Sequence, residues 1–513
     1  MINHVITKTL TKIGLIVCFL LGFLIRLIPE VLSFPHPIGF DTIDYAARIQ
    51  KGVILYHWSF LLYAILVPIY KIANCDPFLL LKLTAPVLYG LNVSGFYYFA
   101  RKALSWDTRK SLMAGAFFAF QLSSLRISWD LYRNALGLGV LLFTLPLLRE
   151  LETSKKEFML FISLSILVVL GHEYAAVIMF AVVLGITMEK FLKGTKDKAL
   201  RVLASILPAL AVFLIGVYFY LNIFPLAFIE ANFIDAHDTF EPKPGGLFFL
   251  TDYLKLVSTD QHYLSYWDLA LHIFSLFILL YLLCIPFISI GFFRDSVLDY
   301  WTIILLIGSL DALLTPFCAL YAWYRYMLML VYPFTFYLVN GIWKVLNSQS
   351  GGVKGNLKLA NIWRKATYGI LLSMILLGSL FMAARIGDGG IFYMPTTTSY
   401  FPSTMLHNTI PLRDVEESVK AIEWLNTRMN NGSVVLVHCA FTSWMRLHLN
   451  SENLMIVYGK DAEDALKAAL ENNFHTIYLI WWNESIGWYG ITIPKNFTSI
   501  FKSGRISIFK YSQ

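Results

Sequence analysis

Long runs of apolar residues alternate with short polar segments through the chain up to about residue 385. About 20 consecutive apolar residues in helical conformation are needed to cross the hydrocarbon core of a bilayer, and most of these runs approach that length. The pattern predicts an α-helical polytopic membrane protein with about 11 transmembrane helices. We place these helices at Ile13–Ser33, Leu83–Ala100, Ser111–Ile127, Asn134–Leu148, Phe158–Leu170, Tyr174–Met188, Val202–Leu221, Trp267–Phe287, Tyr300–Leu320, Tyr326–Val345 and Ala366–Ala384.

After residue 385 the pattern changes to that of a water-soluble domain. Short buried-strand patterns occur at Ser433–Ala440, Asn453–Gly459 and His475–Trp482, and amphipathic helix patterns occur at Val415–Met429 and Ala462–Asn472. We therefore predict two domains, a membrane domain at 1–385 and a small extracytoplasmic α/β domain at 386–513.

The composition supports a membrane protein and argues against nucleic-acid binding. Hydrophobic residues make up 57% of the chain and charged residues only 14%. The net charge of +8 comes from Lys and Arg in short loops, and under the positive-inside rule their clusters mark the cytoplasmic side. This alternation predicts a multi-pass protein of the cell membrane, with a cytoplasmic N-terminus and an extracytoplasmic C-terminal domain. It also indicates that the apolar stretch Trp58–Ala73 is not a full span, because a span there would place the basic cluster Arg101–Lys110 outside. We expect this stretch to lie along the outer surface or to re-enter the membrane.

Two further features limit the function classes. The five cysteines lack metal-like spacing, which argues against a zinc cluster or a disulfide framework. The first apolar run has no cleavage pattern after it and holds Arg26 and Glu30 one helical turn apart, so we expect it to be retained as a signal anchor.

Polar residues gather at the predicted outer ends of several apolar runs. Asn134–Leu148 and Tyr174–Met188 rise only about 22 Å as helices, so their outer ends are expected below the membrane surface, around a recess. With the first external loop (34–82), which contains GFDTIDY, this recess would hold these residues: Asp41, Asp44, Asp130, Tyr132, Arg133, His172, Glu173 and Arg325.

This mixture of side chains has a chemical logic. A carboxylate can deprotonate an acceptor hydroxyl as a general base, and Arg side chains can hold the phosphate of a leaving group. A lipid-phosphate sugar donor would need both groups. Acids with a histidine could instead bind a divalent cation, and the spacing does not decide between these alternatives.

The order of these motifs resembles the C-type glycosyltransferase superfamily, which uses polyprenyl-phosphate sugars at the external membrane face. The likeness covers most of the chain and includes a juxtamembrane helix in the first loop and the external tail. It implies that Asp41 corresponds to the essential Asp of the first external loop, although Asp44 could take that place. It also implies that Asp130 corresponds to the acidic residue that usually follows the third span in this superfamily. The stretch GHEY, which contains His172 and Glu173, resembles the third external loop.

Departures from known branches narrow the hypothesis. The chain resembles a group that contains protein O-mannosyltransferases, lipid A aminoarabinose transferases and oligosaccharyltransferase catalytic subunits. The oligosaccharyltransferase catalytic subunits carry a WWDYG motif; near the expected place this chain has FTSW, and elsewhere it has WWNES. The Asp-Glu pair and His-Pro-Pro segment of the O-mannosyltransferases are replaced by Asp41, Asp44 and His57-Trp58. We therefore predict an inverting single-sugar transferase of another, archaeal-like branch. Its donor would be a polyprenyl-phosphate sugar in the bilayer and its acceptor a glycan, a lipid or a protein.

The roles implied by this reading are catalysis by Asp41 as general base with Asp44, Asp130 and Glu173, and substrate binding by Tyr132, Arg133, His172 and Arg325. Most of these residues also have a structural alternative: helix capping for Asp41, His172 and Glu173, interaction with the helix N-terminal dipole for Asp44, pairing with Arg126 or Arg133 for Asp130, and snorkelling for the arginines. Asp311, expected near mid-span, fits either an interhelical hydrogen bond or a transport path. The external loop 222–265 fits either a substrate lid or a solvated loop. Oligosaccharyltransferase-like glycan transfer and a non-enzymatic lipid or solute transporter stay open as alternatives, although the chain shows no inverted repeat.

Overall fold

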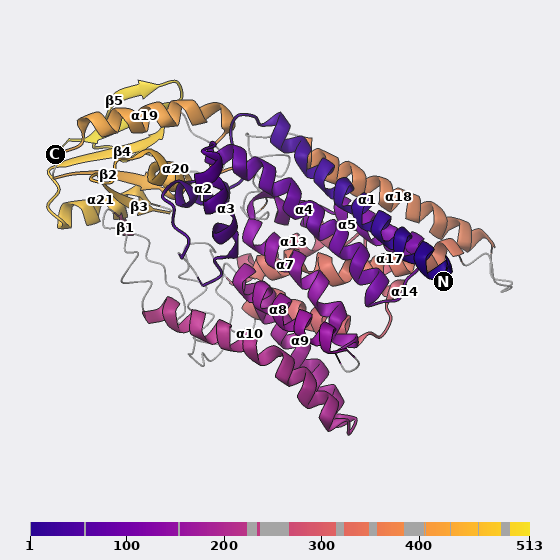
Figure 1. Cartoon of the computed structure of the whole chain (residues 1–513). Coiled ribbons are helices and arrows are strands. Elements are labelled where there is room, and N and C mark those ends of the chain that lie inside the picture. Colours follow the sequence, from indigo (N-terminus) through magenta and orange to yellow (C-terminus); the bar gives the residue numbers. More distant parts are fainter. Residues whose placement is uncertain are drawn as a thin grey trace.

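The computed structural model describes residues 2–55, 58–151, 154–222, 233–235, 266–313, 323–347, 357–383, 405, 407–430, 432–459, 461–483 and 493–512. Within these residues a bundle of helices meets a small sheet-containing domain at one end (Figure 1). The helices of the bundle are α1 (Ile2–Leu32), α2 (Asp41–Gln50), α3 (Leu61–Ala73), α4 (Pro77–Lys102), α5 (Thr108–Phe120), α6 (Leu122–Asp130), α7 (Tyr132–Thr144), η1 (Leu145–Arg149), α8 (Lys155–Gly171), α9 (Glu173–Leu192), α10 (Lys196–Asn222), α13 (Tyr266–Tyr281), α14 (Ile285–Gly291), α15 (Ser296–Leu310), η2 (Asp311–Leu313), α16 (Trp323–Met329), α17 (Val331–Asn347) and α18 (Leu357–Ala383).

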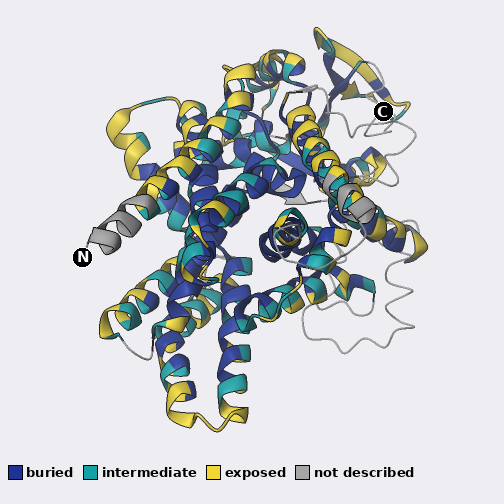
Figure 2. Cartoon of the chain, turned by 90° about the vertical axis from the view of Figure 1, so that its right-hand side faces the viewer, coloured by how far each residue is buried: buried dark blue, intermediate teal, exposed yellow. Residues whose placement is uncertain are grey.

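Seven helical segments among the described residues are long and apolar enough to cross a membrane, or up to eight if the bent pair α13 and α14 is one span. Their outer surfaces carry exposed apolar side chains such as Leu24, Leu214 and Ile303, each about half exposed or more. Figure 2 shows such exposed positions along the outer helices. Apolar surface of this extent is stable in lipid rather than water, so the structure confirms a multi-pass membrane protein. The count of eleven spans stays a prediction.

The predicted helix Ser111–Ile127 is interrupted in the structure. The helix α5 ends at Phe120, and Gln121 adopts an extended conformation with ψ 136°. Its side-chain amide donates to Thr335 Oγ1 at 2.6 Å, so a polar contact with α17 fixes the break. The following helix α6 has only nine residues and ends at Asp130. This break, which periodicity alone does not reveal, places a carboxylate at the end of a short buried helix.

Two other predictions for the bundle can be compared with the structure. Most of the stretch Trp58–Ala73 forms the 13-residue helix α3 (Leu61–Ala73), which is shorter than the candidate spans, as expected for a segment that does not cross the membrane fully. Asp311 is not in mid-helix: α15 ends at Leu310 and Asp311 begins the short helix η2.

The C-terminal domain consists of a six-stranded sheet with helices packed against it. The strand order is β1-β3-β2-β4-β6-β5. The strands β1 to β4 are parallel to one another, and β6 is antiparallel to both of its neighbours, β4 and β5. Its elements are β1 (Phe233–Asp235), η4 (Leu412–Asp414), α19 (Val415–Arg428), β2 (Ser433–His438), α20 (Cys439–His448), β3 (Leu454–Tyr458), α21 (Ala462–Glu471), β4 (Thr476–Trp482), β5 (Phe497–Ser503) and β6 (Ile506–Tyr511).

Most of this domain follows the sequence prediction, with three differences. The helix α20 and the hairpin β5–β6 were not predicted: the predicted strand Ser433–Ala440 covers the first two residues of α20, and the hairpin lies outside the assigned patterns. The strand β1 comes from the external loop 222–265 and pairs with β3, so part of that loop completes the sheet. The other residues of the loop, including His237 and Asp238, lie outside the described residues.

Part of the segment predicted as the first external loop packs into the C-terminal domain. Ile43 of α2 is 2% exposed and belongs to the hydrophobic core of that domain. The helix α2 packs against α20, and Arg446 of α20 lies 3.6 Å from the Asp44 carboxylate. The start of α1 lies at the opposite end of the bundle from the sheet (Figure 1). This arrangement agrees with the predicted sidedness, which itself stays a prediction.

Candidate active site

The backbone before Asp41 is held by side chains from two distant segments. The Gly39 N–H donates to Asn408 Oδ1 at 2.8 Å, and the Phe40 N–H donates to Asp130 Oδ2 at 2.8 Å. Asp41 follows as the first residue of α2, whose N-cap position, Phe40, has no side-chain cap. The capping alternative therefore fits Asp130, which accepts an N–H at the start of α2, better than it fits Asp41.

Gly39 permits this close approach. Its φ of +102° is a conformation that L side chains rarely adopt, and a Cβ there would lie 2.5 Å from Asp130 Cβ and 2.8 Å from Thr42 Oγ1. Both neighbours are buried, at 1% and 2% exposure. The Gly39-to-Asp41 turn and Asp130 therefore have to fit each other.

We expect Gly39→Ala to lower the free energy of unfolding by roughly 2–4 kcal/mol, because it adds a steric clash to backbone strain. Thermal unfolding of the purified protein in detergent measures this loss. Gly52→Ala is the matched control: Gly52 also has a positive φ (+69°), but a Cβ there meets only the end of the Lys71 side chain, at 3.3 Å. Equal losses in the two variants would contradict a specific fit between Gly39 and Asp130.

Asp130 is held by a buried arginine on its own helix. The Arg126 guanidinium forms an ion pair with Asp130 Oδ1, and the two side chains are 4% and 1% exposed. Since Oδ2 accepts the Phe40 N–H, both carboxylate oxygens are engaged. We infer that Asp130 positions the Asp41 turn, whereas its catalytic role stays a prediction.

A second buried arginine fixes the end of α6. Arg26 of α1 donates to the carbonyl oxygens of Ser128 and Trp129, each at 3.0 Å. Carbonyl groups in the last turn of a helix lack intrahelical hydrogen-bond partners. Arg26 supplies these hydrogen bonds to the carbonyl groups of the two residues directly before Asp130. Trp129 in turn donates through Nε1 to the His407 carbonyl at 2.8 Å.

Arg26 belongs to a buried network that sequence reasoning missed. It pairs with Glu30 at 2.8 Å, and Lys82 of α4 lies 3.2 Å from Glu30 Oε2 and 2.7 Å from Ser33 Oγ. All these side chains are buried. The available signal was two ionisable residues, Arg26 and Glu30, inside the first apolar run, and Lys82 directly before the second; ionisable residues within such runs are rare unless they are paired or functional.

Asp41 has an environment suited to proton transfer. Burial, followed by the negative charge of Asp130, raises the pKa of Asp41 to about 6, against an opposing effect of Arg325. The side chain is still partly exposed. A partly accessible carboxylate with a pKa near neutrality is typical of a general base.

Among the neighbouring cations, Arg325 of α16 lowers the pKa of Asp41 most. Its guanidinium stacks at 6.0 Å from the Tyr174 ring and 5.9 Å from the Tyr324 ring, and Nε donates to Tyr324 Oη at 3.3 Å. No carboxylate among the described residues lies within 4 Å of it. Aromatic rings orient this group while leaving its charge available to an anion.

Arg133 and Glu173 form a neighbouring cluster. The Arg133 guanidinium lies 2.8 Å from Glu173 Oε2, and Ser59 Oγ donates to the same oxygen at 2.9 Å. Both charged side chains are only partly exposed, at 15% and 25%. The pair joins α7 to α9 and to the segment before α3. Glu173 is thus paired with Arg133, and its catalytic role stays a prediction.

His172 and Tyr132 occupy structural positions. His172 is the N-cap of α9, where Nδ1 accepts the Tyr174 N–H at 3.1 Å, and it is 2% exposed. Tyr132 is 1% exposed and stacks on Tyr45 at a centroid distance of 5.4 Å. These contacts support the capping alternative for His172 and a packing role for Tyr132.

Asp44 points to the C-terminal domain. Its carboxylate accepts both Arg48 Nε, at 2.6 Å, and Arg48 Nη2, at 3.1 Å, and Arg446 is nearby. This pairing makes Asp44 a link between α2 and α20, and leaves Asp41 as the better candidate for the base.

The structure thus brings Asp41, Asp130 and Arg325 together, places the Arg133–Glu173 pair beside them, and engages Asp44, His172 and Tyr132 in structural contacts. Within the described part of the chain no group of three His, Cys, Asp or Glu residues could hold a metal ion. The divalent cation stays a prediction, and no step below depends on it. His57 lies outside the described residues.

Comparison with known proteins gives little further information. No family of known proteins matches the sequence, and no curated protein matches it either. The fold is similar to that of an archaeal oligosaccharyltransferase, AglB from Archaeoglobus fulgidus, solved in complex with an inhibitory peptide and a dolichol-phosphate. The TM-score is 0.44 at 12% identity, over 92% of this chain and 69% of that chain. A likeness of this size assigns neither a function nor a residue role to the present chain.

Proposed function

We propose that this protein is a membrane glycosyltransferase that transfers a single sugar from a polyprenyl-phosphate donor to an acceptor hydroxyl at the external membrane face. The observation that carries the proposal is the setting of Asp41: a partly exposed carboxylate with a pKa of about 6, on a turn whose Phe40 N–H is bound by Asp130, and within the electrostatic influence of Arg325. It stands where the membrane helices meet a soluble domain. A lipid-linked donor and a water-soluble or membrane-bound acceptor can both reach such a junction.

The reaction can be written with these groups. The acceptor hydroxyl gives its proton to the Asp41 carboxylate as its oxygen attacks the anomeric carbon, with inversion. The bond between that carbon and the phosphate oxygen breaks, and the lipid phosphate leaves with the electron pair. Arg325 stabilises the negative charge that develops on the phosphate. Asp130 and Arg26 hold the turn that carries Asp41.

Purified protein in lipid nanodiscs, incubated with a panel of radiolabelled polyprenyl-phosphate sugars with and without a chelator, tests the donor class. We expect transfer from one donor, with release of the lipid phosphate. Substrate counterflow in proteoliposomes without any covalent product would instead favour a transporter. Product with lipid-linked oligosaccharides alone would favour transfer of a whole glycan.

Removing the proposed phosphate ligand should weaken donor use. We expect Arg325→Ala to raise the KM for the donor by about 10–100-fold, because a charged hydrogen bond to the phosphate is lost, and Arg325→Lys to fall between it and the native protein. Steady-state kinetics with the active donor measure the change. The exposed Arg428→Ala, in the C-terminal domain, is the control and should keep the native KM. A native KM in Arg325→Ala would remove Arg325 from the donor site.

A further inference from the structure

A buried segment at the start of the C-terminal domain, residues 407–410, reaches the turn that carries Asp41. Its four side chains are at most 6% exposed. The His407 ring stacks on Trp129 of α6 at a centroid distance of 4.5 Å, whereas Ile410 belongs to the hydrophobic core of the C-terminal domain. The segment therefore joins the end of α6 to the C-terminal domain at the candidate active site.

Asn408 of this segment holds the first of two successive N–H groups before α2. Its Oδ1 accepts the Gly39 N–H at 2.8 Å, and Asp130 Oδ2 accepts the next N–H, from Phe40, at 2.8 Å. Asp41 is the residue that follows, and it begins α2. Two fixed N–H groups in a row set the direction in which the chain enters the helix, and therefore the position of the Asp41 carboxylate.

The two acceptors differ in charge. Asp130 contributes a carboxylate, whereas the Asn408 amide accepts its hydrogen bond without a charge. Asn408 Nδ2 is buried and has no hydrogen-bond partner among the described residues, so only the oxygen of this amide is used there. Asn408→Asp would therefore keep the acceptor of the Gly39 N–H and would add a negative charge beside the turn.

The groups around Asp41 explain why such a charge matters. Its charged or titratable neighbours are Asp130, Arg325, Asp44, Arg126 and Tyr45. Burial, followed by the acids, raises the pKa of Asp41, whereas the two arginines lower it. The Tyr45 hydroxyl stays neutral, because burial raises its own pKa. A further carboxylate at position 408 would act in the same direction as Asp130 and keep the proton on Asp41 up to a higher pH.

We propose that Asn408 is a positioning residue of the transfer reaction: its side-chain oxygen holds the turn that carries Asp41, and its neutrality keeps the base ionised near neutral pH. The two successive hydrogen bonds, the burial of the segment and the neighbouring Asp130 carboxylate carry the proposal. It rests on the proposed function, since the base that Asn408 positions is the base of that reaction.

The first test is the pH dependence of transfer by Asn408→Asp in nanodiscs, with the donor that supports activity. We expect its acid limb to lie about one pH unit above that of the native protein, because a carboxylate so close to Asp41 disfavours the ionised base. Turnover on the alkaline side should stay close to the native value, because an oxygen still accepts the Gly39 N–H.

Asn408→Leu removes the hydrogen bond without adding a charge. We expect its turnover to fall roughly 10–100-fold, because a displaced base is poorly aligned with the acceptor hydroxyl, while its acid limb and its KM for the donor stay native. A loss of stability alone would not move the acid limb of Asn408→Asp, so the two variants separate positioning from folding. If Asn408→Leu does not elute as a single species, Asn408→Asp, which keeps the size and shape of the side chain, still decides.

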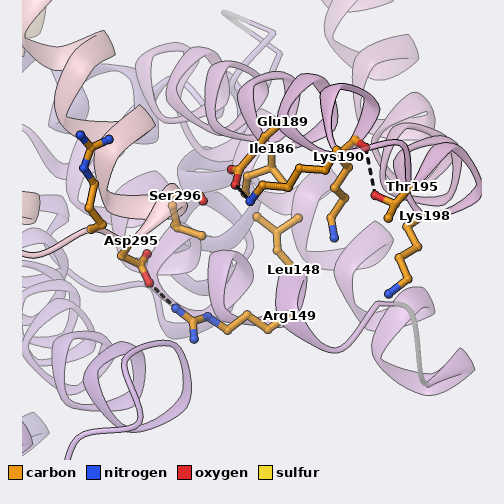
Figure 3. A pocket seen from close by; sticks show the side chains of 12 residues that line it. Leu148, Arg149, Ile186, Glu189, Lys190, Thr195, Lys198, Asp295 and Ser296 are labelled. Atoms are coloured by element: carbon orange, nitrogen blue, oxygen red, sulfur yellow. Dashed lines mark hydrogen bonds and ion pairs between the residues drawn. The ribbon is translucent and has the colours of Figure 1, made fainter.

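Two variants control for the added charge. Asn430→Asp also keeps an acceptor oxygen, here for the Ser433 hydroxyl at 2.6 Å, at an exposed position of the C-terminal domain. Thr195→Asp adds the charge at an exposed position directly before α10, in a pocket with Lys190 and Lys198 at the other end of the bundle (Figure 1, Figure 3). Both should keep the native acid limb, because salt screens exposed charges that are far from the base.

The titration of Asp41 can also be followed without a substrate. The difference in stability between a protein and its Asp41→Asn version, measured across pH by unfolding in detergent, reports the pKa of Asp41. In the Asn408→Asp background this titration should lie about one pH unit higher. Such a change in a protein that transfers no sugar would refute the proposed function and still support the action of Asn408 on Asp41. A native acid limb and titration in Asn408→Asp, native turnover in Asn408→Leu, or equal changes in the controls would overturn the proposal.

Discussion

Asp41→Asn should lower the turnover of sugar transfer by roughly 10²–10⁴-fold while leaving donor binding almost unchanged. The amide keeps the shape of the side chain but cannot accept the proton of the acceptor hydroxyl. Turnover and donor affinity, measured separately with the lipid-phosphate sugar that supports activity, distinguish loss of the base from loss of the site.

The matched control is Asp76→Asn, at the N-cap of α4. Asp76 Oδ1 accepts the Phe78 N–H at 2.6 Å, and Asn caps a helix nearly as well as Asp, so this variant should keep native turnover. If Asp41→Asn also kept native turnover, another group would have to be the base.

The pKa of Asp41 also predicts how pH acts on the protein. Transfer should rise with pH through an acid limb near pH 6, because the ionised carboxylate is the active form. Stability should change in the opposite direction. A carboxyl group with a folded pKa of about 6 and an ordinary unfolded value of 3.8 binds protons more readily in the folded state, so it lowers stability as pH rises from about 4 to 6.

Asp41→Asn should therefore be more stable than the native protein above pH 6, by at most about 3 kcal/mol, and this gain should vanish below about pH 4. Unfolding of both proteins across this pH range measures the difference. A variant that is less stable at pH 7 would contradict the burial of a charged carboxylate at this position.

Arg26→Ala should be among the most destabilising single changes, lowering the free energy of unfolding by roughly 3–5 kcal/mol. It leaves the Glu30 carboxylate buried with Lys82 alone and removes the donors to the last carbonyl groups of α6. Unfolding in detergent measures the loss.

A compensated variant separates stability from positioning. Arg26→Met, Glu30→Leu and Lys82→Met together remove all three buried charges with similar volumes, so stability should recover most of the loss. Transfer activity should stay low, because the end of α6 and hence Asp130 and the Asp41 turn are still unsupported. Native activity in this triple variant would show that Arg26 does not position the site.

Local patterns were sufficient for part of this structure. Long apolar runs located most helices, and short apolar runs located the buried strands β2, β3 and β4, because such runs are properties of adjacent residues. The polar residues at the predicted outer ends of the apolar runs included Asp41 and Asp130, and the structure places Asp130 against the turn that leads into Asp41. Whether these residues catalyse transfer stays a prediction.

Long-range contacts account for what the patterns missed. The break at Gln121 depends on Thr335, 214 positions away, and the second cation at Asp44, beside its local partner Arg48, is Arg446 of the other domain. Arg26 contacts carbonyl groups more than 100 positions along the chain. No local periodicity encodes such contacts. Site roles for Asp44, His172 and Tyr132 stay predictions, beside the structural contacts that these residues make.

The presence of Ile43 in the core of the C-terminal domain, together with the Gly39–Asn408 hydrogen bond, has a consequence for engineering. The helix α2, which carries the proposed base Asp41, also contributes Ile43 to the core of the C-terminal domain. Chimeras that exchange the tail at residue 386 would strip this helix of its support, whereas chimeras that exchange residues 34–50 along with the tail would keep it. The unit of exchange is therefore discontinuous in sequence.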